Sequence, residues 1–334
     1  MEKRIPYYDL LRAVAILAVL LIHSLNAEIN NEISWIVVLV RQLINFAVPL
    51  FIALSGYFMV DKVFNAEYTY KMFLQKQISR VYLPYLVWSL PYIFVALYFK
   101  GETILNSLYK LLTFQISGIF YYVFLIIQFY IFFPLLKKMT NKRGLVIATL
   151  LSFICCLIFF FLKLFLNIDI PLIIYAGNFI TWIMFFILGM YLKRNKVSLN
   201  NKTLIILIFL SLILELIETK IHFNMLNNIG EAITAVKISS FIYSGLLIIL
   251  LLKENMVNIK TSKFLESLGQ VSYAIYLNHL LVLIFANKIV KLIFMENTLL
   301  TQLLVFLITM VVSYLLCIMI KSIDKSRAHK YLGI

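Results

Sequence analysis

The fold class follows from the first apolar run of the chain, residues 8–24, which reads YDLLRAVAILAVLLIHS. The run is apolar enough to cross a bilayer, yet it contains Arg12 and His23. In an α-helix, their spacing of eleven residues places both side chains on one face, about 16 Å apart along the axis. The two groups cannot touch each other, so we expect them to serve opposite halves of a membrane-buried site.

Ionisable side chains inside a membrane span are rare, and function is their default interpretation. The alternative is structural. In that case the long side chain of Arg12 extends to the lipid headgroups, and His23 caps the outer end of the helix. The first run alone leaves both interpretations open.

Composition places the whole chain in the membrane. Of its 334 residues, 63% are hydrophobic and only 13% are charged, and apolar runs of about twenty residues recur along its length. We therefore expect an all-α polytopic membrane protein forming one integral domain over residues 1–334. The net charge of +15 would suggest a nucleic-acid partner in a soluble protein. Here it follows from lysines and arginines in cytoplasmic loops, so we expect membrane lipids and no nucleic acid.

Apolar runs separated by charged gaps predict about ten membrane helices, at residues 8–26, 34–60, 81–99, 117–136, 145–166, 171–192, 203–221, 232–252, 270–287 and 299–320. With the N-terminus inside, 21 basic residues fall in inner segments, beginning with Lys3 and Arg4, and only six in outer segments. This asymmetry predicts that both termini are cytoplasmic. The inner connection 61–80 mixes aromatic and basic residues, which predicts an amphipathic interface helix leading into the third span. The three cysteines form no CxxC or Cys/His cluster, so we expect neither a disulfide nor a metal.

Three further patterns carry polar groups. Residues 48–58 close the second span and include Ser55-Gly56, which could simply permit close helix packing. Residues 77–84 lie at the inner mouth of the third span, where Arg80 could be an ordinary positive-inside anchor and Pro84 suits a helix start. In the ninth span, Ser272, Tyr276 and His279 share one helix face through their i, i+4, i+7 spacing.

In this order and on these spans, the patterns resemble the acyltransferase 3 family, bacterial ten-helix membrane enzymes that O-acylate cell-surface glycans and related acceptors. The most specific marks are Tyr8-Asp9-Leu10-Leu11-Arg12 followed by His23, the stretch 51–58 with Ser-Gly-Tyr, and Tyr276-Leu277-x-His279. The family's usual Arg-x-x-Arg at the third span appears here as Gln77-x-x-Arg80, without its first arginine. The neighbouring Lys76 would point about 100° away from Gln77 on a helix.

The resemblance implies a stand-alone enzyme without the SGNH-type esterase domain that many members carry. The chain ends about a dozen residues after its tenth predicted span, so a separate extracellular relay protein would have to supply any acyl relay. The resemblance also implies a bacterial cytoplasmic membrane as the location. The donor would be cytosolic acyl-CoA as a cosubstrate, with acetyl-CoA the default and succinyl or longer groups still open, and no permanently bound cofactor.

The implied mechanism assigns roles to the marked residues. Arg80 with Lys76 and Gln77, and Arg12 behind them, would bind the donor's phosphates. His23 and Arg12 are the candidate catalytic residues, with His23 as general base or transient acyl carrier. Acceptor or oxyanion roles are expected for Arg41, Ser55, Tyr276, His279 and Glu215. Arg41 could equally be an interfacial anchor, and Glu215, near the outer side, could equally be solvated.

The acceptor could be a glycan or a lipid-linked sugar. Two competing functions use the same residues differently. Buried Arg, His and Lys also suit a secondary transporter or an exporter of a lipid-linked glycan. The chain shows neither the internal repeat nor the paired broken helices of such folds. A membrane sensor that kept the fold without the chemistry is a third alternative, and it would tolerate His23→Ala.

Overall fold

The computed structural model describes residues 5–253, 259–294 and 296–334, and Lys3 and Arg4 lie outside them. Over this part of the chain the regular elements are helices and one short hairpin, β1–β2. Each of the ten runs expected to be a span forms helix. The first half of the chain contains α1 (Pro6–Ser24), β1 (Glu28–Ile29), β2 (Glu32–Ile33), α2 (Trp35–Leu43), α3 (Ala47–Met59), α4 (Tyr70–Lys100), α5 (Ile104–Leu112), the 3-10 turn η1 (Gly118–Phe120), α6 (Tyr121–Lys138) and α7 (Lys142–Leu166).

The second half continues with a similar alternation of long helices and short turns. Its elements are α8 (Leu172–Tyr175), α9 (Phe179–Arg194), α10 (Asn201–Leu226), α11 (Ile229–Ala232), α12 (Ile238–Leu251), α13 (Lys263–Gln270), α14 (Ser272–Ile293), α15 (Leu299–Ile323), α16 (Lys325–Arg327) and the π-helical turn η3 (Ala328–Leu332). We call the end of the bundle at which α1 begins the inner end, because the basic residues predict that it faces the cytosol.

Eight helical segments among the described residues are long and apolar enough to cross a membrane. This confirms the all-α polytopic class, although length and composition alone support fewer spans than the ten expected. The two remaining helices fall short for physical reasons. Helix α12 has only 14 residues, and α10 carries Glu215, Glu218 and Lys220, which interrupt its apolar run.

The second and third expected spans differ from the prediction. The second is broken into α2 and α3, because the chain turns at residues 44–46. The third is part of α4, which runs unbroken over 31 residues from Tyr70, so the helix expected within 61–80 covers only residues 70–80 and is continuous with the span. Pro84 lies inside this helix and not at its start. The inner part of α4 does not lie alone at the interface, because Phe73 is buried against Phe64 and Phe133.

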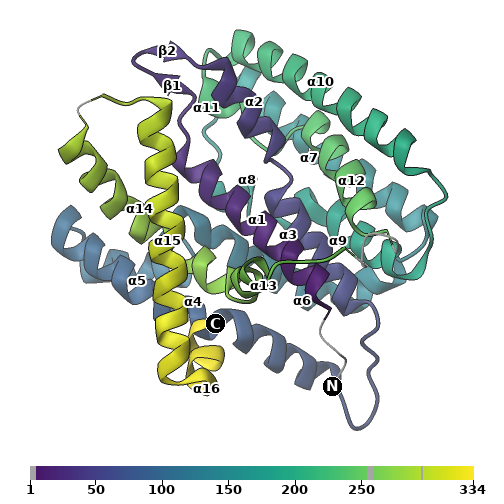
Figure 1. Ribbon diagram of the computed structural model, residues 1–334. Helices are drawn as coiled ribbons and strands as arrows, with labels where there is room; N and C mark the ends of the chain where they lie inside the picture. The colour runs from purple at the N-terminus through teal and green to yellow at the C-terminus, as the bar shows by residue number, and fades with distance from the viewer. Residues whose placement is uncertain (1–4, 254–258, 295) are drawn as a thin grey trace.

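Helix α1 runs through the middle of the bundle, with α14 and α15 on one side and α7, α10 and α12 on the other (Figure 1). It packs against α3, α13, α14 and α15. Gly56 of α3 faces the backbone of Phe186, and Gly189 of α9 faces the backbone of Ala53, with no room for a Cβ atom at either position. The packing role considered for Gly56 is therefore confirmed.

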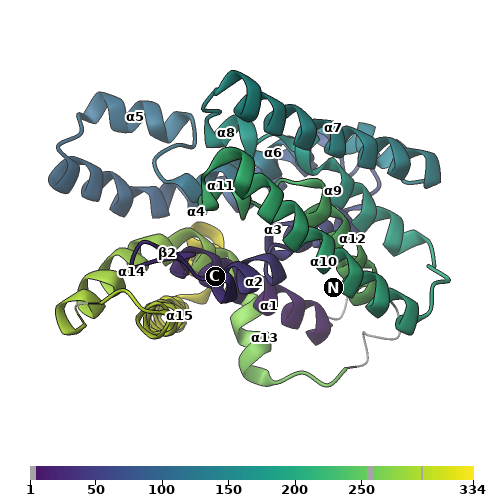
Figure 2. The ribbon, with the colours of Figure 1, turned by 90° about the horizontal axis from the view of Figure 1, so that it is seen from above.

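Large apolar side chains cover the outside of the outer helices. Figure 2 shows α7 at one edge of the bundle and α15 at the opposite edge. Both helices bury only about a fifth of their apolar window inside the protein. Their exposed residues include Leu150, Ile154, Phe161, Leu307, Val311 and Met319. Surfaces of this kind suit lipid, so the structure agrees with a multi-pass membrane protein.

Candidate active site

A cavity of about 300 Å³ lies beside the inner two-thirds of α1. Arg12 and Val19 contribute from α1, and they share the helix face that continues to His23. The other walls come from α3, α4, α6, α13 and α14, through Val48, Phe51, Ser55, Val81, Tyr122, Ile126, Tyr130, Gly269, Gln270, Ser272, Tyr273 and Tyr276. The cavity thus follows the stripe that the sequence singled out, from Arg12 towards His23.

Arg12 marks the inner end of this cavity. Its Nη1 donates to Oδ1 of Asp9 at 2.8 Å, and Asp9 is buried. Its guanidinium carbon also lies 5.1 Å from the centroid of the Phe58 ring. These contacts hold the arginine head against the protein and beside the cavity. The i, i+3 spacing of Asp9 and Arg12 could have revealed this pair from the sequence.

His23 and His279 meet beyond the outer end of the cavity. Their ring centroids are 5.2 Å apart, so α1 and α14 bring two imidazoles to one place. His279 is fully buried, and its Nδ1 lies 2.7 Å from the carbonyl oxygen of Tyr276. A carbonyl only accepts, so Nδ1 carries the proton and Nε2 presents a lone pair. That Nε2 is buried and has no hydrogen-bond partner among the described residues, whereas the His23 side chain is exposed.

Arg41 holds the end of α1 on which His23 sits. Its Nη1 donates to the carbonyl oxygens of Ile22, at 2.6 Å, and Leu25, at 3.3 Å. The last carbonyls of a helix lack intrahelical donors and attract positive charge, which explains this contact. The Nε of Arg41 is buried and without a hydrogen-bond partner in the described part of the chain. The arginine therefore sits beside His23 with one donor unused.

Ser55 and Tyr276 lie in the cavity wall. The Ser55 hydroxyl donates to the carbonyl of Phe51 at 2.9 Å, and the Tyr276 hydroxyl donates to the carbonyl of Ile119. The ring of Tyr276 is 5.3 Å from that of Tyr122 and 5.9 Å from that of His279. Tyr276 therefore connects the middle of the cavity to the histidine pair.

The expected donor-binding residues lie on α4, in the turns that precede the cavity-lining Val81. Lys76 and Arg80 are exposed on the inner part of α4 and share one face through their i, i+4 spacing. Gln77 is half-buried and shares the face of Val81, which lines the cavity. Arg80 therefore directly precedes the cavity-lining Val81, and Lys76 lies one helical turn before Arg80.

Glu215 does not belong to this site, and the expectation of a solvated or acceptor-facing carboxylate was wrong. It is fully buried between α10 and α12, where its Oε1 accepts from Asn45 Nδ2 at 2.9 Å and from the Ser240 hydroxyl. The buried Lys237 belongs to the same polar cluster and donates to Gln42 Oε1 at 2.7 Å. The sequence gives no sign of this cluster, because its members come from three distant segments.

Sequence reasoning also missed the aromatic lining of the cavity. Tyr122 and Tyr130 of α6 and Tyr273 of α14 line it, although tyrosines near span ends are typical of the interfacial belt. Their place in the cavity wall, on α6 and α14, distinguishes these tyrosines from the belt.

Comparison with known proteins identifies the family of the chain. A family model described as an acyltransferase domain, acyltransferase 3, matches residues 5–319. No curated protein and no solved structure matches the chain. The matched range includes every helix that lines the cavity and both histidines of the pair. The chain therefore belongs to the acyltransferase 3 family, as a multi-pass membrane acyltransferase.

Proposed function

We propose that this enzyme moves an acyl group, acetyl by default, from cytosolic acyl-CoA to a hydroxyl group of a cell-surface or lipid-linked glycan. The observation that carries the proposal is the cavity along α1, which extends from Arg12 to Tyr276, whose ring is 5.9 Å from that of His279. A donor entering from the cytosol would approach the His23–His279 pair along this cavity. The enzyme would work in the bacterial cytoplasmic membrane.

The inner end suits the anionic head of the donor. The phosphates of CoA would bind the exposed Arg80 and Lys76 through charge-assisted hydrogen bonds, with Gln77 beside them. The pantetheine arm would then pass Arg12 and Tyr273 into the cavity. Because Arg12 is about 16 Å from His23 along α1, we assign it to the donor and not to the reacting atoms.

The outer end supplies the base. His23 would take the proton of the acceptor hydroxyl while the hydroxyl oxygen attacks the carbonyl carbon of the thioester. The carbon–sulfur bond then breaks, and the CoA thiolate leaves and takes that proton from His23. Atoms and charges balance, with an ester and free CoA as products. In the alternative route, His23 attacks the thioester carbonyl first and forms an acyl-histidine. A second nucleophile, the acceptor hydroxyl or a separate extracellular relay protein, would then take the acyl group from it.

Two neighbours would prepare His23 for this step. His279 offers the lone pair of Nε2, and the 5.2 Å centroid separation lets a small ring rotation bring an N–H of His23 within hydrogen-bonding distance. Such a bond fixes the tautomer of His23 and leaves its other nitrogen as the base, as the third member of a catalytic triad does. The unused Nε of Arg41 is available to a developing oxyanion, while Ser55 and Tyr276 shape the wall.

Donor binding tests the proposal without knowledge of the acceptor. Titration of acetyl-CoA, succinyl-CoA and free CoA into the purified protein in nanodiscs should show saturable binding by calorimetry. Arg80→Ala should weaken it by about tenfold, the loss of one charge-assisted bond. Arg143→Ala is the matched control, because Arg143 is exposed on the first turn of α7 and does not line the cavity. A folded wild-type protein that binds no acyl-CoA would overturn the proposal.

A further inference from the structure

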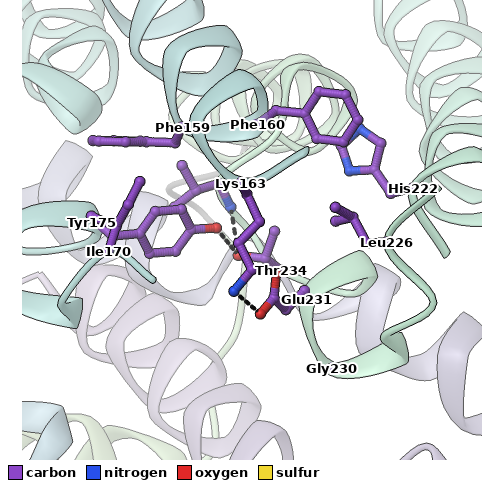
Figure 3. Close-up of a pocket in the computed structure, with 11 residues that line it drawn as sticks. Phe159, Phe160, Lys163, Ile170, Tyr175, His222, Leu226, Gly230, Glu231 and Thr234 are labelled. Atoms are coloured by element: carbon purple, nitrogen blue, oxygen red, sulfur yellow. Dashed lines mark hydrogen bonds and ion pairs between the residues drawn. The ribbon is translucent and has the colours of Figure 1, made fainter. Parts of the chain in front are cut away.

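A second pocket, of about 220 Å³, lies between the ends of α7 and α10 and the short helix α11 (Figure 3). It opens at the end of the bundle opposite the inner end, because α7 and α10 run in the same direction as α1. None of its lining residues belongs to the cavity beside α1. They are Phe159, Phe160, Lys163, Ile170, Tyr175, His222, Leu226, Gly230, Glu231, Thr234 and Val236.

The pocket has an apolar side and a polar side. Figure 3 shows Phe159 and Phe160 on one side and Glu231 and Thr234 on the other, with the Lys163 side chain between them. His222 stacks on Phe160 with ring centroids 4.0 Å apart and supports that wall. Opposite, the hydroxyl groups of Tyr175 and Thr234 lie 2.6 Å apart. A ligand held here would meet ring faces on one side and hydrogen-bonding groups on the other.

The charges of the pocket are compensated within it. Lys163 pairs with Glu231 and, at 3.0 Å, with Asp169, so one cation faces two carboxylates. His222 lies 3.6 Å from Glu218, another carboxylate. Phosphate and carboxylate ligands need uncompensated cations, which this arrangement does not offer. The pocket is therefore suited to a neutral ligand with both hydroxyl groups and an apolar face.

The position of α11 connects the pocket to the histidine pair. Ile229, Ala232 and Ile233 pack with Leu25 at the end of α1. Gly230, Glu231 and Thr234, on the other side of the same segment, line the pocket. The segment 229–234 thus lines the pocket on one side and, on the other, joins the apolar cluster at the end of α1 that carries His23.

We propose that this pocket binds a neutral sugar unit of the acceptor glycan, next to the unit that is acylated. A pyranose ring has an apolar C–H face for Phe159 and Phe160 and hydroxyl groups for Glu231, Tyr175 and Thr234. A volume of about 220 Å³ is below that of pockets for drug-sized ligands and is suited to a single ring. The inference rests on the proposed function, because it extends the acceptor side of the same reaction.

Two neighbouring residues provide a matched test. Leu226 lines the pocket, whereas Met225 is half exposed at 49% and does not. Leu226→Trp should fill the pocket, and Met225→Trp should leave it open; tryptophan is tolerated at both sites because they lie near the membrane interface. Tyr175→Phe, which removes only a hydroxyl group, is a second variant that preserves the packing.

Saturation-transfer NMR on the nanodisc-embedded protein would use cellobiose, maltose and diacetylchitobiose as neutral probes and glucose 6-phosphate as the anionic probe. We expect saturable binding of at least one neutral probe. Leu226→Trp should weaken it by about tenfold and Tyr175→Phe by a smaller factor, with Met225→Trp unchanged. The inference is overturned if no neutral probe binds, if Leu226→Trp binds as well as Met225→Trp, or if the phosphorylated sugar binds best.

Acetyl-CoA binding, measured on the same samples, separates this inference from the proposed function. Leu226→Trp should bind acetyl-CoA as the wild type does, because the donor cavity lies elsewhere. If Leu226→Trp binds both acetyl-CoA and the sugar probes as the wild type does, only the sugar-pocket inference is wrong. If the folded wild type binds no acetyl-CoA, the proposed function itself is wrong.

Discussion

His23 and His279 come from helices at opposite ends of the chain, yet their imidazole centroids are 5.2 Å apart. His23 lies in the last turn of α1, and His279 lies in the inner half of α14, which packs against it. The hydrogen bond to the carbonyl of Tyr276 keeps the proton of His279 on Nδ1. Nε2 of His279 therefore carries a lone pair that can accept a hydrogen bond. One histidine is thus held in place by its own helix, while the other is exposed.

His23→Ala should abolish acyl transfer and leave the fold intact. A general base contributes about 10²- to 10⁴-fold to rate, and alanine removes it without disturbing the buried core, because His23 is exposed. The measurement is release of free CoA from acetyl-CoA, with size-exclusion chromatography and thermal unfolding as controls for folding. Full activity in this variant would show that His23 is not the base.

His279 should act through His23 as a positioning residue. His279→Phe removes the Nε2 lone pair and should lower kcat by at least about tenfold, with little change in KM for the donor. His279→Gln keeps an acceptor atom and should recover part of the activity, which a role in packing alone would not explain. Steady-state kinetics of both variants across pH 5 to 9 would distinguish the two roles. Equal activity of the two variants would contradict the positioning role.

Gly189→Ala should destabilise the protein. A Cβ atom there would collide with the backbone of Ala53, and the helices α3 and α9 would have to separate. Overpacking of this kind costs about 1–3 kcal/mol and should lower Tm in detergent. Gly118→Ala is the control, because its Cβ would meet only Leu172 Cδ2 at an ordinary 3.5 Å. A Tm for Gly189→Ala equal to that of the control would refute the close contact.

Lys237→Met should be strongly destabilising. The buried ammonium donates to Gln42, to Thr219 and, at 3.1 Å, to the carbonyl of Ala232, and all three acceptors lose a donor in the variant. Breaking such a buried charged cluster costs about 3–5 kcal/mol. Lys220→Met removes an exposed lysine from the same outer region and should change little. Thermal unfolding of both variants would measure the difference, and similar Tm values would show that the buried cluster contributes little.

Much of the architecture could be predicted from the sequence, because helix formation and membrane crossing depend on local patterns. The lengths of the apolar runs predicted where the helices lie, and the spacing of Arg12 and His23 predicted a shared face. The cavity follows that face. The start of α4 differs from the prediction because packing and capping contacts decide it. Packing of Phe73 and capping by Thr69 begin α4 at Tyr70, whereas hydropathy placed the start of the third span at residue 81.

The site itself depends on contacts that no local pattern encodes. Glu215 seemed an outer, solvated carboxylate, but it is buried and bonded to Asn45, in the turn after α2, and to Ser240 of α12. The polar stripe and the family motif singled out His279, but neither indicated that it meets His23, more than 250 residues away. The amino-acid sequence alone determines the membrane class, the helices and the face on which each polar group lies, because these follow from a 3.6-residue period and the thickness of a bilayer. Which faces meet, and hence which groups form the site, depends on side-chain packing between distant helices.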